Sequence, residues 1–328
     1  MELRAGRWLI TGVAGFIGSH LLERLLNLGY VVVGIDNFST RSMVNLESVR
    51  SLVGEKAWRN FTLHEGDVTK ISSEFCNLGT FDFVLHQAAL CSVPESAQEP
   101  GRYFTNNLLS NIQLLEGLKQ GWCERLVYAS SSAVYGEGDL NGNIESQDLF
   151  PLSPYGETKR TAELLAKQYS MAHELEWIGL RYFNVFGTRQ NYSGPYSSVI
   201  QVWLNALRND RPCQIYGDGS AVRDFVPVDR VVDYNLLAAA GLPKFATNRV
   251  FNVATGKGIT ILQLFELFKS IIENKLQRKI QDPEFFSARP GDIQVSIGRM
   301  DLATNYFPLM KPIDFRSALA DMIYKLYE

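Results

Sequence analysis

Short apolar runs alternate with longer amphipathic segments through the first half of the chain. Runs rich in valine, isoleucine, leucine and aromatic residues predict buried strands at 7–12, 30–36, 61–67, 81–89, 125–132 and 177–187. Between them, apolar residues at helical spacing predict helices at 16–29, 106–120 and 157–174. Strands that alternate with helices and are apolar on both faces are typical of a doubly wound parallel sheet with helices on both sides.

The pattern is less regular in the second half of the chain. Helices are expected at 198–210, 228–241 and 261–276, and loops at 189–196 and 287–292. We therefore expect an α/β chain in two parts. A Rossmann-like doubly wound parallel sheet would occupy 1–188, and a smaller C-terminal substrate-binding lobe would occupy 189–328, with segments that return to the first domain.

Composition narrows the range of functions. The 328 residues are 46% hydrophobic and 20% charged, and 32 basic against 35 acidic residues give a net charge of −3. A general nucleic-acid binder usually carries an excess of basic residues, so we do not expect this chain to bind nucleic acid. Cys76, Cys91, Cys123 and Cys213 form no CxxC pair and have no zinc-ligand spacing. With no signal peptide and no apolar stretch that could span a membrane, we expect a cytoplasmic protein without a metal.

A glycine-rich turn connects the first strand to the first helix. Gly12, Gly15 and Gly18 would let the backbone approach a pyrophosphate, whose charge the helix N-terminus favours. Asp36 ends the next strand, where a carboxylate can bind both adenosine ribose hydroxyls and repel a 2′-phosphate. The pattern favours NAD over NADP, although Arg41 lies close enough to keep NADP open.

Polar residues follow other predicted strands. Asp67 and Val68 are candidates to bracket the adenine, although Asp67 can also be read as a turn residue after Gly66. Serines 130–132 and Asn184 end later strands, where ligands bind in doubly wound sheets. His86 ends a buried strand, and we expect it to be structural rather than catalytic.

Tyr155 and Lys159 lie one helical turn apart in "SPYGETK". A pair at this spacing can be a simple surface contact. Alternatively, the ammonium lowers the pKa of the phenol so that it can move protons near neutral pH.

These features occur with ordered motifs that include "TGVAGFIGSHL", "DNFST", "HQAALCSVPES", "YASSSAVYG", "LRYFNVFG", "IYGDGSAVRDFVPVDRV" and "ARPGD". The set resembles the extended short-chain dehydrogenase/reductases, specifically the nucleotide-sugar 4-epimerases, and is most similar to those acting on UDP-N-acetylhexosamines. The resemblance implies a UDP-sugar substrate, a tightly bound NAD and a homodimer. It also implies inversion of the sugar C4 through a transient 4-keto sugar.

The resemblance assigns roles by motif position. It implies that Ser131, Tyr155 and Lys159 are catalytic, with Ser132 as the alternative hydroxyl. The cofactor would contact Gly12, Gly15, Phe16, Ile17, Gly18, Asp36, Asn37, Asp67, Val68, Ala88, Asn107, Tyr155, Lys159 and Phe183. The UDP-sugar would contact Ser92, Ser131, Ser132, Tyr155, Asn184, Val199, Tyr216, Arg223, Arg289, Asp292 and Ser296.

Departures from related families refine the expected reaction. Sugar dehydratases of this superfamily carry an Asp-Glu pair after the catalytic hydroxyl, where this chain has Ser132 and Ala133. Ser296 matches a position where a small residue leaves room for an acetamido group, and Glu95 replaces a common basic residue. We expect interconversion of UDP-N-acetylglucosamine and UDP-N-acetylgalactosamine, with UDP-glucose as a further substrate. The alternatives are a UDP-glucose or UDP-uronic acid 4-epimerase, or a non-catalytic relative that binds NAD or a sugar nucleotide.

Overall fold

The computed structural model describes residues 3–39, 43–71, 78–190, 198–277, 279–289, 291–308 and 312–327. Within these ranges, a seven-stranded parallel sheet has the order β10-β6-β5-β4-β1-β2-β3. Its strands are β1 (Arg7–Thr11), β2 (Val31–Asp36), β3 (Phe61–Glu65), β4 (Phe81–His86), β5 (Cys123–Ser131), β6 (Glu176–Tyr182) and β10 (Arg249–Val253). The strand order reverses between β1 and β4, which is where ligands bind in such sheets. The predicted doubly wound, Rossmann-like α/β fold is confirmed.

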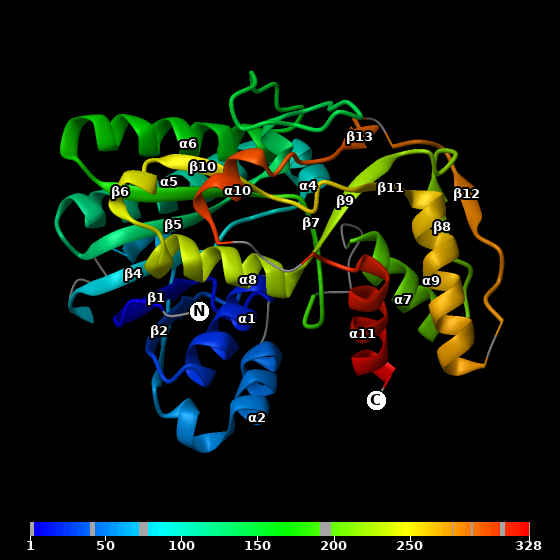
Figure 1. Ribbon diagram of the computed structural model, residues 1–328, viewed down its shortest axis with the longest axis horizontal. Coiled ribbons are helices and arrows are strands. Elements are labelled where there is room, and N and C mark those ends of the chain that lie inside the picture. Colours follow the sequence, from blue (N-terminus) through cyan, green and yellow to red (C-terminus); the bar gives the residue numbers. More distant parts are fainter. Residues whose placement is uncertain are drawn as a thin grey trace.

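Helices lie on both faces of this sheet (Figure 1). One face carries α1 (Phe16–Asn27), α2 (Val44–Trp58) and α8 (Val228–Leu236), and the other carries α5 (Pro100–Lys119) and α6 (Pro154–His173). Side chains alternate along β1, so Trp8 and Ile10 enter the core under α1 while Leu9 enters the core under α5. This alternation explains why the three central residues of the strand are all apolar.

A second core lies beside the main sheet. Trp203 on α7 (Val199–Arg208) packs against Phe265 and Phe268 on α9 (Ile261–Leu276), and α11 (Phe315–Tyr327) covers the same core. Short strands border it, namely β7 (Asn184–Phe186), β8 (Gln214–Tyr216), β9 (Val222–Pro227), β11 (Gly258–Thr260), β12 (Glu284–Phe286) and β13 (Val295–Ser296). β7, β11 and β13 all pair with β9, and β12 pairs with β8.

The structure differs from the sequence-based expectation at several elements. The single strand expected at 177–187 is divided, because after Tyr182 the chain leaves the main sheet and β7 pairs with β9 instead. The helix expected at 228–241 ends at Leu236 and continues as a π-helical turn, η4 (Leu237–Gly241). We did not predict α2, α4 (Val93–Gln98), α10 (Asp301–Tyr306) or the short turns η1 (Val68–Lys70), η3 (Ser132–Val134) and η5 (Lys244–Ala246).

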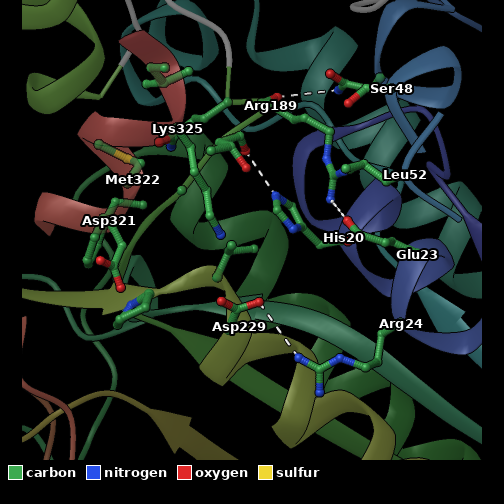
Figure 2. Close-up of a pocket in the computed structure, with 18 of the residues that line it drawn as sticks. His20, Glu23, Arg24, Ser48, Leu52, Arg189, Asp229, Asp321, Met322 and Lys325 are labelled. Atoms are coloured by element: carbon green, nitrogen blue, oxygen red, sulfur yellow. Dashed lines mark hydrogen bonds and ion pairs between the residues drawn. The ribbon is translucent and has the colours of Figure 1, made fainter. Parts of the chain in front are cut away.

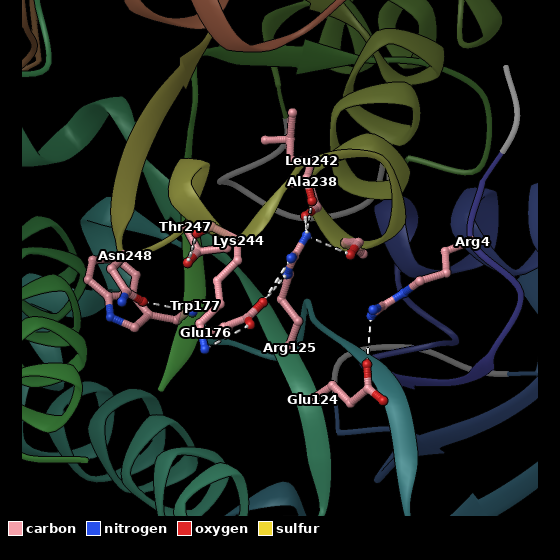
Figure 3. A network of polar contacts seen from close by, with 11 residues as sticks. Arg4, Glu124, Arg125, Glu176, Trp177, Ala238, Leu242, Lys244, Thr247 and Asn248 are labelled. Carbon is pink, nitrogen blue, oxygen red and sulfur yellow. Dashed lines mark hydrogen bonds and ion pairs between the residues drawn. The ribbon is translucent and has the colours of Figure 1, made fainter. Parts of the chain in front are cut away.

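A buried arginine joins the sheet to this π-helical turn (Figure 3). Arg125 on β5 donates from Nη1 to the carbonyl oxygens of Ala238, Ala239 and Leu242 at 3.1, 3.0 and 2.8 Å. Its Nη2 also pairs with Glu176 Oε2 at 2.8 Å. The last carbonyl groups of a helix have no partner within the helix. Because Arg125 is only 4% exposed, its guanidinium, and not water, is the partner of these carbonyl groups.

Replacing Arg125 with methionine should lower the free energy of unfolding by about 3 kcal/mol, because Glu176 and three carbonyl groups would lose a buried partner. Denaturant unfolding measures the change. Arg4→Met is the matched control, because Arg4 pairs with Glu124 at 2.7 Å on the exposed surface (Figure 3). The control should change stability by less than about 1 kcal/mol. Equal effects of the two substitutions would contradict this account of Arg125.

Candidate active site

The turn between β1 and α1 has no room for a side chain at two of its glycines. Gly12 has a φ of +70°, and a Cβ atom there would lie 2.7 Å from the Ala88 backbone nitrogen. At Gly18 a Cβ atom would lie 2.1 Å from the Gly12 carbonyl oxygen. The turn therefore brings bare backbone to the start of α1, where unpaired N–H groups favour an anion. This geometry fits the pyrophosphate of a dinucleotide.

Carboxylates lie at the carboxyl ends of the two neighbouring strands, where Asp36 is the last residue of β2 and Asp67 follows β3 by two residues. Asp36 accepts hydrogen bonds from the backbone N–H groups of Ala14 and Phe38, both at 2.9 Å, and so ties β2 to the glycine turn. Asp67 caps η1 by accepting from the Thr69 N–H at 2.9 Å, and Asn37 donates to it at 3.4 Å. Burial opposes ionisation of Asp67, but these hydrogen bonds hold its pKa below the usual value. Asp67 thus remains an acceptor at neutral pH, and both side chains lie beside the turn.

The next segment holds Ala88 against the turn. His86 Nδ1 lies 2.6 Å from the Thr11 hydroxyl, and burial together with nearby Lys159 lowers the pKa of His86 to about 3. Because His86 stays neutral and is hydrogen-bonded to Thr11 on the neighbouring strand, we interpret it as a structural residue. Asn107 on α5 exchanges hydrogen bonds with the Leu90 backbone at 2.9 and 3.0 Å, which fixes the chain beyond Ala88.

The structure brings Ser131, Tyr155 and Lys159 together at the carboxyl end of β5. Ser131 is the last residue of β5, and its hydroxyl lies close enough to the Tyr155 phenol to lower the pKa of the phenol. Lys159 is buried and donates from Nζ to the Ala129 carbonyl at 2.8 Å, and its Nζ lies 5.8 Å from the centre of the Tyr155 ring. Ser132 begins η3 next to this group. The helix therefore presents a phenol and an ammonium toward the strand that carries the serines.

In the protein by itself the pKa of the Tyr155 phenol is raised, so the lowering expected from Lys159 together with a positive nicotinamide stays a prediction. Burial, followed by the nearby Cys91, raises the pKa of the phenol, and the nearby Ser131 hydroxyl opposes this only in part. Burial also lowers the pKa of Lys159 to about 8, against opposing effects of Cys91 and Glu163. The lysine keeps its proton near neutral pH, but making Tyr155 a base requires positive charge beyond that of Lys159.

A buried polar network lies directly beneath these residues. Glu163, one turn after Lys159, pairs with Arg181 on β6 at 2.6 Å and accepts from the Ser130 hydroxyl at 2.5 Å. Arg181 also donates to the Tyr135 hydroxyl at 2.8 Å. Each charged group has a partner, so the network holds α6, β5 and β6 in one arrangement.

Several predicted substrate residues gather on β9, β13 and the segment between β12 and β13. Arg223 on β9 lies opposite Ser296 on β13 in the register of the two strands and pairs with Asp292 at 2.7 Å. The guanidinium of Arg289 lies 3.7 Å from the centre of the Tyr216 ring. The Asp292 N–H donates to the Arg289 carbonyl at 3.2 Å and thereby links the two pairs.

Other predicted substrate residues have different surroundings. Asn184 begins β7 and lies opposite Phe225 on β9. Ser92 caps α4, where its hydroxyl accepts from the Glu95 N–H at 3.2 Å. Val199 begins α7 and packs against the second core. Arg41, Cys76 and part of the 189–196 loop lie outside the described residues.

Two residues near the predicted catalytic group were missed. Cys91 is exposed in the "ALCSVP" segment and acts electrostatically on both Tyr155 and Lys159. Glu163 supports Lys159 from the next helical turn. Their sequence signals were weak, because Cys91 is a single thiol in a loop and Glu163 could equally have been a surface residue.

A pocket of about 870 Å³ lies between α1, α2, the segment after β7 and α11 (Figure 2). None of its described lining residues belongs to the predicted site. His20 donates from Nε2 to the Thr188 carbonyl at 2.9 Å, and Arg189 pairs with Glu23 at 2.6 Å. Burial, then Arg189, lowers the pKa of His20 to about 3. We interpret this pocket as a crevice beside the second core and not as the active site.

The described residues bring together no group of three or more His, Cys, Asp or Glu side chains suited to a metal ion. No helix in the described part of the chain is long and apolar enough to cross a membrane.

Comparisons with known proteins show the family to which the chain is related. A family model described as "NAD dependent epimerase/dehydratase family" matches residues 8–254. A UDP-glucose 4-epimerase from Pisum sativum is 34% identical over 312 residues, covering 87% of this chain and 85% of the relative.

Two solved structures are also similar. A UDP-N-acetylglucosamine 4-epimerase from Methanobrevibacter ruminantium, solved with UDP-N-acetylmuramic acid, has a TM-score of 0.88 and 34% identity, with 99% of each chain covered. A UDP-glucuronic acid 4-epimerase from Bacillus cereus, solved with UDP-glucuronic acid and NAD, has a TM-score of 0.80 and 29% identity, with 98% and 100% covered.

A Gly18→Ala substitution should abolish retention of a dinucleotide, because the new methyl group would collide with the Gly12 carbonyl and open the turn. The nucleotide released from purified, denatured protein can be quantified by chromatography. Gly101→Ala is the control, since a Cβ atom at Gly101 meets open space. An unchanged nucleotide content in the Gly18 variant would contradict the assignment of this turn.

Proposed function

The chain belongs to the NAD dependent epimerase/dehydratase family, and on that premise we propose that it is an NAD-dependent UDP-sugar 4-epimerase. The observation that carries this proposal is the grouping of Ser131, Tyr155 and Lys159 at the carboxyl end of β5. Ser132 and Ala133 stand where a dehydratase needs an acid pair, which favours epimerisation over loss of water.

NAD fits the cofactor site because the glycine turn offers bare backbone at the start of α1 and two carboxylates end the adjacent strands. When bound, it supplies reversible acceptance of hydride from the sugar C4. Asp36 would bind the adenosine ribose, with Asn37, Asp67 and Val68 near the adenine. Phe16, Ile17, Ala88, Asn107 and Phe183 would line the remainder of the site.

The chain's own residues handle the proton. Tyr155 would take the proton from the sugar O4 and return it, while Ser131 holds O4 by a hydrogen bond. Lys159, protonated near neutral pH, would hold the nicotinamide ribose and stabilise the phenolate. Since burial raises the pKa of Tyr155 in the protein alone, Tyr155 would become basic only with a second positive charge nearby, such as the charge that an oxidised nicotinamide carries.

The UDP portion would bind to the residues on and around β9. Tyr216 offers a ring face to the uracil, while Arg223 and Arg289 suit the diphosphate oxygens because a guanidinium forms bidentate hydrogen bonds to phosphate. Arg289 lies on the Tyr216 ring and Arg223 is paired with Asp292, so UDP must share or displace these contacts. Asn184, Val199 and Ser92 would complete the site.

The preferred substrate is proposed to be UDP-N-acetylglucosamine, interconverted with UDP-N-acetylgalactosamine, with UDP-glucose as a further substrate. Two observations support this preference: Ser296 is small, and a similar solved structure is a UDP-N-acetylglucosamine 4-epimerase. UDP-glucose or UDP-glucuronic acid is the second candidate, because relatives of comparable similarity carry those names.

The organisation of the chain follows from the same proposal. Residues 1–188 would form the NAD-binding domain and 189–328 mainly the UDP-sugar-binding lobe, with β10 returning to the main sheet. We propose a cytoplasmic homodimer that pairs α5 and α6 with the same helices of a second copy. Leu109, Leu164 and Met171 support this pairing, since they are 37%, 49% and 73% exposed on those helices.

Tyr155→Phe tests the reaction. The variant should bind UDP-sugars as the wild type does, yet lose about 10²–10⁴-fold in epimerisation rate, because no group remains to move the O4 proton. Chromatographic separation of UDP-N-acetylglucosamine from UDP-N-acetylgalactosamine measures the rate, and calorimetric titration measures binding. Full activity in the variant would exclude Tyr155 as the base. A wild type that binds UDP-sugars but epimerises none would favour the non-catalytic alternative.

Ser296→Tyr tests the substrate preference. The larger side chain should lower kcat/KM for UDP-N-acetylglucosamine at least about tenfold while changing that for UDP-glucose less than about threefold. Ser296→Ala is the control and should retain both activities, since it leaves the space open. Equal losses on both substrates would show that position 296 does not sense the acetamido group.

A further inference from the structure

Glu137 connects the loop after the predicted catalytic serines to the strand that carries Ser296. Its carboxylate accepts from the Gln294 N–H at 2.9 and 3.0 Å, and from the Val295 N–H at 2.8 Å. Two consecutive backbone N–H groups thus point at one carboxylate. Hydrogen bonds to an ionised acceptor are stronger than neutral ones, so this contact should fix the strand firmly.

The other edge of the same strand pairs with β9. The Val222 N–H donates to the Gln294 carbonyl at 2.7 Å, and Arg223 Nη1 donates to the same carbonyl at 3.3 Å. Residues 294–296, which we name the substrate strand, therefore lie between Glu137 on one side and β9 on the other. The position of Arg223 and Ser296 relative to the catalytic loop depends on both contacts.

Further bonds continue this junction beyond the substrate strand. The Gly138 N–H donates to the Val295 carbonyl at 3.1 Å, and the Asn143 N–H donates to the Ile297 carbonyl at 2.8 Å. These bonds join backbone to backbone. Glu137 adds a contact from a side chain, at the end of the junction nearest Gln294. It follows Ser131 by only six residues in the sequence.

We propose that Glu137 is a positioning residue that sets the substrate strand, with Arg223 and Ser296, against Ser131 and Tyr155. This inference rests on the proposed function. Glu137 touches neither the sugar nor the cofactor in this account, and it acts through the backbone that it holds. Losing its carboxylate would loosen the UDP-binding residues in the free protein, and binding would then require ordering them.

Three variants test the proposal. Glu137→Ala removes every bond to the substrate strand, and Glu137→Gln keeps one acceptor oxygen and should partly rescue the effect. Asp139→Asn is the matched control, because Asp139 is exposed in the same loop and its carboxylate accepts from the Asn141 N–H at 2.7 Å, within that loop. Bound NAD, quantified after denaturation, should be equal in all three and in the wild type.

The readouts are KM and kcat for UDP-N-acetylglucosamine and UDP-glucose, and the Kd of UDP by calorimetric titration. Glu137→Ala should raise KM and the Kd of UDP about tenfold, equivalent to the loss of one charge-assisted hydrogen bond, with a smaller change in kcat. The ratio of kcat/KM for UDP-N-acetylglucosamine to kcat/KM for UDP-glucose should move closer to one. Glu137→Gln should lie between Glu137→Ala and the wild type, and Asp139→Asn should match the wild type.

Distinct results separate this inference from the proposed function. Unchanged KM and unchanged Kd of UDP in Glu137→Ala, with an active wild type, would overturn the role of Glu137 alone. A loss of NAD and kcat without a change in KM would also overturn it, since that pattern indicates general damage to the fold. If the wild type epimerises no UDP-sugar, the proposed function fails, yet weaker UDP binding in Glu137→Ala would still support the positioning role.

Discussion

The hydrogen bond from Lys159 to the Ala129 carbonyl, at 2.8 Å, is the constraint on which the candidate active site depends. Lys159 is only 4% exposed, and a buried ammonium is costly unless it has a partner. This contact joins α6 to β5 two residues before Ser131, so it fixes the distance between the helix that carries Tyr155 and the strand that carries the serine. Of the two hydrogen bonds between α6 and β5 described above, it is the one nearer to Tyr155 in the sequence.

The surrounding structure maintains that constraint from two directions. On α6 itself, Glu163 pairs with Arg181 and so holds α6 to β6, and the Ser130 hydroxyl on β5 donates to the Glu163 carboxylate. From the side, Glu137 connects the loop after β5 to the substrate strand. The glycine turn follows the carboxyl end of β1. Because β1 and β5 run parallel, this turn and Ser131 lie at the same edge of the sheet. One sheet edge thus carries the residues proposed for the cofactor, the proton and the UDP group.

Much of this could be predicted from residue pattern, and the failures have physical reasons. The parallel sheet followed from apolar runs that alternate with amphipathic segments. The spacing placed Tyr155 and Lys159 one helical turn apart, whereas their proposed roles came from the resemblance to nucleotide-sugar 4-epimerases. The break between β6 and β7 could not be predicted, because both segments are apolar and only tertiary pairing with β9 separates them. The burial that raises the pKa of Tyr155 also depends on packing, which the sequence does not show. Glu137 was invisible because its partners are backbone groups more than 150 residues away.

Reversible oxidation at C4 can be tested by following the hydrogen on C4 during epimerisation in D₂O, with no NAD added. A hydrogen that leaves and returns as hydride does not exchange with solvent, whereas one removed as a proton does. We expect the UDP-sugar to convert to its 4-epimer with no deuterium bound to carbon, as read by NMR and mass spectrometry. Deuterium at C4 of the product would contradict reversible oxidation at this site.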